Sequence, residues 1–231
     1  MNSMSIDLNS EFAKEIRKVL KDFSPTRLIE TGTYLGLGST AILAQTLKDL
    51  EIKKPKLFSI EINPRYYRQA VENIYILGFS NIVQIFNGLS IRRNQLPSLS
   101  EIQEEFVNKV WSVGTYIDHD IEDRVKRYYE ETNFVGMPDM LLLQCLRMFD
   151  FFPDFVLLDS GGHIGYTEFT TLLKYLINPC IVALDDIYHV KHHNSFLDIQ
   201  KDKRFKILKV SSEKFGFCIT YFTPRGRDEA P

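Results

Sequence analysis

Short apolar runs alternate with segments of helical periodicity along most of this chain. Five runs rich in β-branched and aromatic residues lie at positions 27–31, 57–61, 82–86, 154–159 and 180–186. Apolar residues at helical spacing lie between them, at positions 39–50, 65–77 and 166–176. Strands that are apolar throughout, and that alternate with helices, are typical of a parallel sheet with helices on both faces. The sequence therefore predicts an α/β fold.

Two further apolar runs, at 205–210 and 217–222, follow one another closely. Only the residues SSEKFG separate them, too few for a crossover helix, so the pair is predicted to be antiparallel. We therefore expect a seven-stranded, mostly parallel sheet, in which six strands run one way and the antiparallel last strand is inserted against them. A leading helix at about 10–21 and a flexible polar tail at 224–231 complete the prediction.

A long segment interrupts the alternation between the third and fourth predicted strands. It spans residues 91–153, far more than one crossover helix needs. Residues 140–148 supply an ordinary crossover helix, and residues 100–135 are predicted to form a helical insertion within a single domain of 231 residues. Apolar residues recur at helical spacing at 102–111 and 117–128. The insertion is either a solvated cap or homodimer surface, or a lid over a substrate.

The charge and the cysteines exclude several classes of protein. Lys and Arg number 28 against 30 Asp and Glu, whereas proteins that bind nucleic acid usually have a basic excess, so no nucleic-acid partner is expected. The 3 cysteines are far apart, which argues against a disulfide or zinc framework and favours a reducing compartment. The N-terminal residues show no apolar stretch of the kind found in signal peptides and the longest apolar runs are of strand length, so we expect no signal peptide, no membrane span and a cytoplasmic protein.

A glycine-rich loop follows the first predicted strand. It reads ETGTYLGLGST from Glu30 to Thr40 and leads into a helix. Glycines let a backbone approach a ligand closely, and a helix N-terminus offers free N–H groups, so a ligand is expected here. The spacing G-x3-G-x-G differs from the dinucleotide-binding G-x-G-x-x-G, which disfavours a nicotinamide-dependent oxidoreductase. A carboxylate at Glu30 would repel a pyrophosphate but attract an ammonium or a sulfonium.

This loop resembles the first motif of the class I S-adenosylmethionine-dependent methyltransferases, which has the form acidic-x-Gly-x-x-x-Gly-x-Gly. The resemblance implies a Rossmann-like fold and S-adenosyl-L-methionine as the cofactor, with its methionine part wrapped by the loop. Glu30 would hold the amino group, directly or through water, and the helix start at Ser39 would face the carboxylate. The other loop residues implied in cofactor binding are Gly32, Thr33, Gly36 and Gly38.

The next two strand ends would hold the rest of the cofactor. Glu61 ends the second strand beside Ile62, and an acid at this place can accept hydrogen bonds from both ribose hydroxyls. Gly88 and Leu89 follow the third strand, where the family often has Gly-Asp beside the adenine. Because Leu89 replaces the acid, the adenine contact is expected from the backbone of Gly88 and Leu89.

Three acids, Asp159, Asp185 and Asp186, follow the fourth and fifth predicted strands. Like charges at close range are unfavourable, so a cation is expected to relieve them, and Mg²⁺ or Ca²⁺ suits such oxygen ligands. The arrangement resembles catechol-type and sugar-directed O-methyltransferases, which hold a divalent ion with acids at these positions. The resemblance implies a metal site at all three residues, with Asp159 also a candidate for catalysis and for cofactor binding.

Histidines near these acids are candidate bases. An imidazole with a pKa of about 6.5 could take the acceptor's proton where no metal is used. His163 is the first such candidate and His189 the second. The cluster His189-x-x-His192-His193 is also compatible with a transition-metal site or with a plain helix surface. Lys191 lies within it and would add a basic spot for an anionic substrate.

These features predict an enzyme that moves a methyl group from S-adenosyl-L-methionine to a small-molecule or sugar-like acceptor, at oxygen, with or without a divalent cation such as Mg²⁺. One alternative is a non-catalytic protein that binds S-adenosylmethionine or acts as a scaffold. The intact set of glycines and acids disfavours it. The other alternative is the nicotinamide-dependent oxidoreductase.

Overall fold

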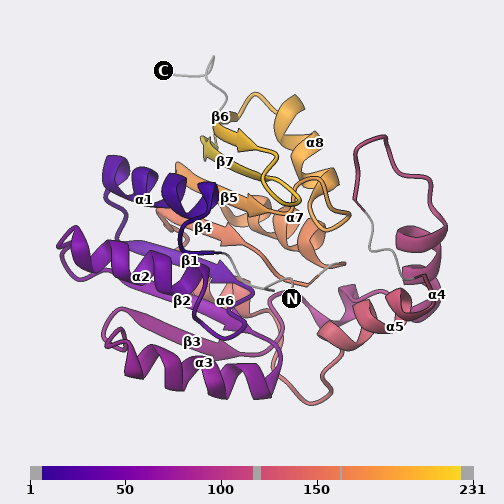
Figure 1. The fold of residues 1–231 in the computed structure, drawn as a ribbon, viewed down its shortest axis with the longest axis horizontal. Helices are drawn as coiled ribbons and strands as arrows, with labels where there is room; N and C mark the ends of the chain where they lie inside the picture. The colour runs from indigo at the N-terminus through magenta and orange to yellow at the C-terminus, as the bar shows by residue number, and fades with distance from the viewer. Residues whose placement is uncertain (1–6, 117–120, 162, 225–231) are drawn as a thin grey trace.

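A seven-stranded sheet forms the centre of the computed structural model, which describes residues 7–116, 121–161 and 163–224 (Figure 1). The strand order is β3-β2-β1-β4-β5-β7-β6. The strands are β1 (Arg27–Thr31), β2 (Lys56–Glu61), β3 (Val83–Asn87), β4 (Phe155–Leu158), β5 (Cys180–Asp185), β6 (Phe205–Ser211) and β7 (Phe217–Phe222). The seven predicted strands are confirmed, and the tail predicted beyond Pro224 lies outside the described residues.

Strand direction follows the prediction as well. The pairs β1–β2, β2–β3, β1–β4 and β4–β5 are parallel, while β7 is antiparallel to both β5 and β6. The order reverses between β1 and β4, because β1 leads outward to β2 on one side and β4 leads outward to β5 on the other. In an open α/β sheet such a switch point opens a crevice at the carboxyl ends of the strands, where ligands bind.

Helices cover both faces of the sheet. Alternate strand residues, such as Leu28 and Leu57, pack with α1 (Glu11–Phe23), α2 (Ser39–Asp49) and α3 (Pro64–Ile76). Their neighbours, such as Ile29 and Phe58, pack on the other face with α6 (Leu141–Met148), α7 (Gly165–Tyr175) and α8 (His193–Lys201). Burial on both faces explains why the strands read as continuous apolar runs. None of the described helices is both long and apolar enough to cross a membrane.

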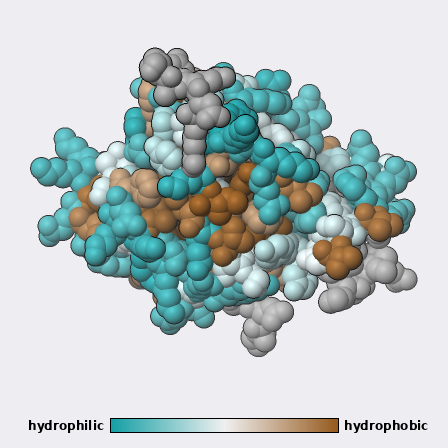
Figure 2. All heavy atoms as spheres, turned by 90° about the horizontal axis from the view of Figure 1, so that it is seen from above, coloured by the Kyte–Doolittle hydropathy of each residue, from teal (hydrophilic) through white to brown (hydrophobic). Residues whose placement is uncertain are grey.

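One edge of the sheet, β6, is protected by charge. Its lysines Lys206 and Lys209 stand among half-exposed apolar residues such as Ile207, and lysines on an edge strand discourage pairing with another chain. Figure 2 looks onto the molecule from above and shows hydrophilic side chains framing an apolar band on this face. The exposed apolar surface on this face is therefore a band that hydrophilic side chains border.

The segment between β3 and β4 contains extra helices, as predicted. They are η1 (Arg93–Gln95), α4 (Leu99–Ile102), the π-helical η2 (Gln103–Asn108) and α5 (Ile121–Thr132), followed by α6. Ser98 and Glu101 form a capping box at the start of α4. The helical pattern expected at 117–128 begins at residues that lie outside the described part, and α5 covers its remainder. In Figure 1, α4 and α5 lie beside the carboxyl end of the sheet.

Candidate active site

A cavity of about 980 Å³ opens at the carboxyl end of the sheet. Its wall comes from the loops after β1 to β5, from α5 and from the β6–β7 loop. The predicted site residues in this wall are Gly32, Glu61, Ile62, Gly88, Leu89, Asp159, Asp185, Asp186 and His189. The predicted residues that do not contribute to it are Glu30, Thr33, Gly36, Gly38, Ser39 and His163.

Gly32 allows two strand ends to approach each other. Its φ is +84°, and a Cβ at this position would overlap the backbone carbonyl of Asp159. Gly36 also has a positive φ, at +70°, but a Cβ there would make only ordinary contacts with Ile74 of α3. Gly32 is therefore required by a contact within the chain itself, and Gly36 is favoured by its backbone conformation.

Glu30 lies behind the loop. Its side chain is fully buried, and its Oε2 accepts hydrogen bonds from Thr40 Oγ1 at 2.6 Å and Ser59 Oγ at 2.7 Å. Its Oε1 has no hydrogen-bond partner among the described residues. Burial raises the pKa of this carboxyl to about 7. Glu30 therefore does not reach the cavity wall, where the direct contact with a ligand's amino group implied by the motif would take place. Ser39, at the start of α2, is buried as well.

Glu61 is the acid of this half that faces the cavity. Its Oε2 accepts a hydrogen bond from the N–H of Tyr34 at 2.7 Å, and its Oε1 accepts one from the N–H of Asn63 at 2.8 Å. Tyr34 has a φ of +51°, and its ring meets Tyr66 edge-on at the same wall. Burial raises the pKa of Glu61 to about 7. The chain thus fixes one carboxylate at the end of β2, with lone pairs left for a ligand.

The end of β3 differs from the prediction in one respect. The N–H of Gly88 donates to Glu61 O at 3.0 Å, and the N–H of Leu89 donates to Pro138 O at 2.8 Å. Both donors are therefore used within the chain, so the expected backbone contact to a ligand is limited to the carbonyl oxygens. Gly88 is needed here because a Cβ would lie 2.5 Å from Pro138 O. The sequence could not show that the segment before α6 folds against this turn.

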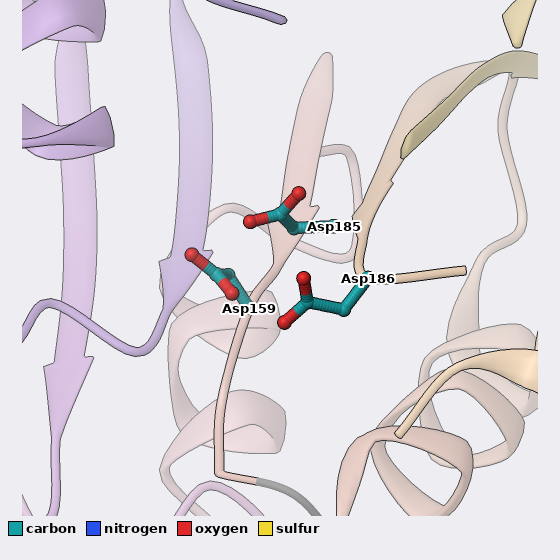
Figure 3. Close-up of side chains that lie close together, drawn as sticks. All are labelled: Asp159, Asp185 and Asp186. Atoms are coloured by element: carbon teal, nitrogen blue, oxygen red, sulfur yellow. The ribbon is translucent and has the colours of Figure 1, made fainter. Parts of the chain in front are cut away.

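The acids that follow β4 and β5 converge, as predicted (Figure 3). One carboxylate oxygen from each of Asp159, Asp185 and Asp186 lies within 4.8 Å of the others. Asp186 has a φ of +57°, a left-handed conformation that turns the chain sharply after β5. Burial raises the pKa of Asp159 to about 6, and burial with the two neighbouring acids raises the pKa of Asp185 well above its usual range.

The cation that relieves these charges comes from the chain itself. Lys191 Nζ lies 2.6 Å from Asp159 Oδ1 and 2.8 Å from Asp186 Oδ2. The lysine is buried, with 5% of its surface exposed, and the neighbouring acids hold its pKa well above its ordinary value. The sequence suggested Lys191 only as a basic surface spot, because its distance from Asp159 along the chain gave no sign of this contact.

The histidines are separated by the structure. His163 Nε2 is hydrogen-bonded to Thr132 Oγ1 at 3.0 Å, and burial lowers the pKa of its imidazole to about 4. His189 lines the cavity, where its Nε2 lies 3.3 Å from Tyr128 OH and its Nδ1 accepts the N–H of Lys191. The helix-surface interpretation is wrong for His189 and His192, because both are buried. His192 contacts Ser195 while His193 contacts Ser112, so they do not share a ligand.

Glu168 is a buried acid that sequence reasoning missed. It lies on α7, and its Oε1 accepts hydrogen bonds from Ser90 and, at 2.7 Å, from Ser160. Its Oε2 accepts one from Thr31 Oγ1 at 3.0 Å. Ser90 and Ser160 follow β3 and β4, and Thr31 is the last residue of β1, so a single carboxylate holds three strand ends together below the cavity. It lies in the first turn of α7, and no motif of the sequence marked it as a site residue.

Glu168 also makes stability depend on pH. Burial raises its pKa to about 7, so the folded carboxyl keeps its proton to a higher pH than the unfolded one. Stability from this group is therefore full below about pH 4 and falls as the pH rises to about 7. The wild-type protein should lose unfolding free energy between pH 5 and pH 8, and we expect this loss to be about 2 kcal/mol smaller in Glu168→Gln, which has no carboxyl to titrate. Urea titrations at both pH values measure this.

Glu168→Ala is the matched control for that experiment. At pH 5 it should cost about 2–4 kcal/mol, because it leaves three buried hydroxyls without their acceptor and opens a cavity. Equal stability of the Ala and Gln variants at pH 5 would contradict the role of Glu168 in holding the strand ends.

Known structures share this architecture. No protein-family model matches the sequence, and no curated protein matches it. The structure resembles an O-methyltransferase from Bacillus cereus in complex with S-adenosylhomocysteine (SAH), with a TM-score of 0.57, 16% identity and coverage of 94% of this chain and 83% of that one. It also resembles TomG from Streptomyces achromogenes in complex with S-adenosylmethionine (TM-score 0.58, 14% identity, coverage 96% and 83%). A third is the SAH-bound methyltransferase PaMTH1 from Podospora anserina (TM-score 0.54, 12% identity, coverage 92% and 78%).

These similarities cover 92–96% of this chain, at identities of 12–16%. The seven-stranded sheet, parallel except for β7, matches the fold of these structures. The chain therefore has the Rossmann-like fold of the class I S-adenosylmethionine-dependent methyltransferases.

Proposed function

We propose that this protein is an S-adenosylmethionine-dependent methyltransferase that acts on an oxygen of a small-molecule acceptor. The observation that carries the proposal is the position of Glu61, whose carboxylate is fixed at the end of β2 and faces the same cavity as the carboxylates after β4 and β5. The acid proposed to bind the ribose and the carboxylates proposed to face the acceptor therefore line the same cavity. The resemblance to structures crystallised with S-adenosylmethionine or SAH supports this assignment.

The cofactor fits the half of the cavity formed by β1, β2 and β3. Glu61 would accept hydrogen bonds from the two ribose hydroxyls, and the edge-on pair Tyr34 and Tyr66 would flank the nucleoside. The carbonyl oxygen of Gly88 is the backbone acceptor proposed for the adenine amino group, whereas the carbonyl oxygen of Leu89 already accepts the N–H of Leu141 at 3.0 Å. Gly32, which has no side chain, would let the methionine part pass close to the backbone. The buried Oε1 of Glu30 would meet the amino group through water.

The acceptor fits the other half, under α5. The wall there includes Tyr128 and Thr132 of α5, Phe215 of the β6–β7 loop, and the carboxylates. Cavities of about 300–1,000 Å³ are typical for small ligands, so a volume of about 980 Å³ has room for a cofactor and a modest acceptor together. Because α5 belongs to the insertion, we propose that the insertion selects the acceptor.

The residues of the chain would align the acceptor and remove its proton. S-adenosylmethionine supplies a methyl group activated by a sulfonium. Asp186, which is partly exposed in the cavity, is the proposed proton acceptor for the hydroxyl. His163 is a poor candidate, because its imidazole does not line the cavity. His189 would hold the side chain of Tyr128 in place at the cavity wall through the contact between its Nε2 and the Tyr128 hydroxyl.

The insertion also has an exposed apolar surface. Its residues Val110 and Val135 are 93% and 88% exposed. We propose that this surface takes part in a homodimer, which sedimentation as a monomer at high protein concentration would contradict.

The proposed function predicts selective binding of one cofactor. Calorimetry should show one S-adenosylmethionine site per chain with a dissociation constant in the micromolar range, and no heat with NAD, because the loop lacks the dinucleotide glycine spacing. SAH should compete for the same site. Absence of binding by both S-adenosylmethionine and SAH would end the proposal, and binding of NAD alone would replace it with the oxidoreductase.

A further inference from the structure

The carboxylate cluster already contains a positive charge. Lys191 Nζ contacts Asp159 and Asp186 at 2.6 and 2.8 Å, and these are its ion-pair partners among the described residues. The side chain of Lys191 is 6% exposed, against 18% for Asp159 and 26% for Asp186. The Lys191 side chain is therefore more deeply buried than either acid, and it neutralises both of them at the wall of the cavity.

The chain around Lys191 holds this position firmly. Its backbone N–H donates to His189 Nδ1 at 3.2 Å, and its carbonyl lies against Gly165, where a Cβ would come within 2.7 Å. The preceding Val190 is buried against Ile102 and Tyr128 of the insertion. Contacts on both sides thus fix the loop between β5 and α8, so the ammonium is placed by packing and not by a flexible surface side chain.

A divalent cation does not fit the cluster in this arrangement. Mg²⁺ requires oxygen ligands at about 2.0–2.1 Å and tolerates little deviation from octahedral geometry. One oxygen of Asp159 and one oxygen of Asp186 are already in contact with an ammonium, which would repel a dication placed among the same three carboxylates. Metal binding would therefore require Lys191 to leave its buried position.

We propose that Lys191 is the built-in cation of this site, and that it replaces the divalent metal ion that the three acids would otherwise need. It is a positioning residue: it holds the Asp159 and Asp186 carboxylates in place, and an ammonium with three N–H donors keeps one for an acceptor oxygen in the cavity. The part concerning the acceptor rests on the proposed methyltransferase function, whereas the replacement of the metal does not.

The experiment compares Mn²⁺ binding, followed by electron paramagnetic resonance, with thermal unfolding of the same proteins. The variants are Lys191→Met, which keeps the length of the side chain without its charge, and the double variant Lys191→Met/Asp186→Asn. Lys214→Met is the matched control, because Lys214 also lines the cavity but has no ion pair within the described residues. The wild-type titration needs no variant to fold.

We expect wild type and Lys214→Met to bind no Mn²⁺ at millimolar concentration, and Lys191→Met to gain a site at least 10-fold tighter, which the double variant loses. Lys191→Met should also melt about 6–12 °C lower, with part of the loss restored by Asp186→Asn. If Lys191→Met binds no Mn²⁺ but shows this loss and recovery, the proposal still stands, because protonation then relieves the acids.

Three results would overturn it. The first is stoichiometric Mn²⁺ binding by wild type that Asp186→Asn removes. The second is a Lys191→Met protein that binds no Mn²⁺ and is as stable as wild type. The third is a loss of stability that Asp186→Asn does not restore. None of these depends on S-adenosylmethionine, so calorimetry with the cofactor tests the proposed function separately.

Discussion

Alanine at position 32 is expected to lower the free energy of unfolding by about 3–5 kcal/mol and to abolish binding of S-adenosylmethionine. Gly32 has a φ of +84°, a conformation that costs an L-residue about 1–3 kcal/mol. Its new Cβ would also overlap the backbone carbonyl of Asp159. Because that neighbour is backbone and not a movable side chain, β1 and β4 would have to separate at the point where the cavity begins. Urea unfolding followed by fluorescence measures the loss.

Gly78→Ala is the matched control for this variant. Gly78 also has positive φ, at +72°, but a Cβ there would meet nothing within 4 Å. It should therefore show only the cost of the backbone conformation, about 1–2 kcal/mol, and bind the cofactor normally. Equal losses in the two variants would mean that the contact between Gly32 and Asp159 adds nothing, and the close approach of the strand ends would then have to be revised.

The architecture of the sheet could be predicted from sequence because burial leaves a continuous signal there. A strand such as β4, buried on both faces between helical layers, has no room for polar residues, so its apolar run ends within about one residue of the strand itself. The short connection before β7 likewise allowed only an antiparallel pair. The insertion carried a weaker signal: α4 has four residues and continues as a π-helical turn, which no simple period describes.

The candidate site was predictable to the extent that it depends on strand ends. Parallel strands bring their carboxyl ends together, so Asp159 and Asp186 were expected to meet, and they do. The divalent cation predicted for these acids stays a prediction, whereas the contact of Lys191 with two of them was not predicted. Lys191 reaches the acids only because Val190 and Gly165 fix its loop, and such packing has no local pattern in the sequence. The buried Glu168 was missed for the same reason.

Replacing Glu61 by alanine is expected to weaken S-adenosylmethionine binding about 100-fold or more. Hydrogen bonds to a charged group contribute about 1.5–3 kcal/mol each, and Glu61 is proposed to accept one from each ribose hydroxyl. The fold should survive, because burial raises the pKa of this carboxyl to about 7 and its removal relieves a buried acid. Calorimetry with S-adenosylmethionine, together with a melting curve of each protein, checks both statements.

Glu61→Gln should weaken S-adenosylmethionine binding nearly as much as Glu61→Ala does, because the hydrogen-bond acceptors matter as well as the charge. The two carboxylate oxygens accept hydrogen bonds from the N–H groups of Tyr34 and Asn63. The amide nitrogen of glutamine is itself a donor, so at either position it would meet an N–H group and form no hydrogen bond. Glu72→Ala on the exposed side of α3 is the control, and it should bind as wild type does because that carboxylate is outside the cavity. A change of less than threefold in Glu61→Ala would remove this residue from the ribose contact. Cofactor binding would then have to depend on other residues of the wall, of which Tyr34 is the nearest candidate, since Glu61 fixes its N–H.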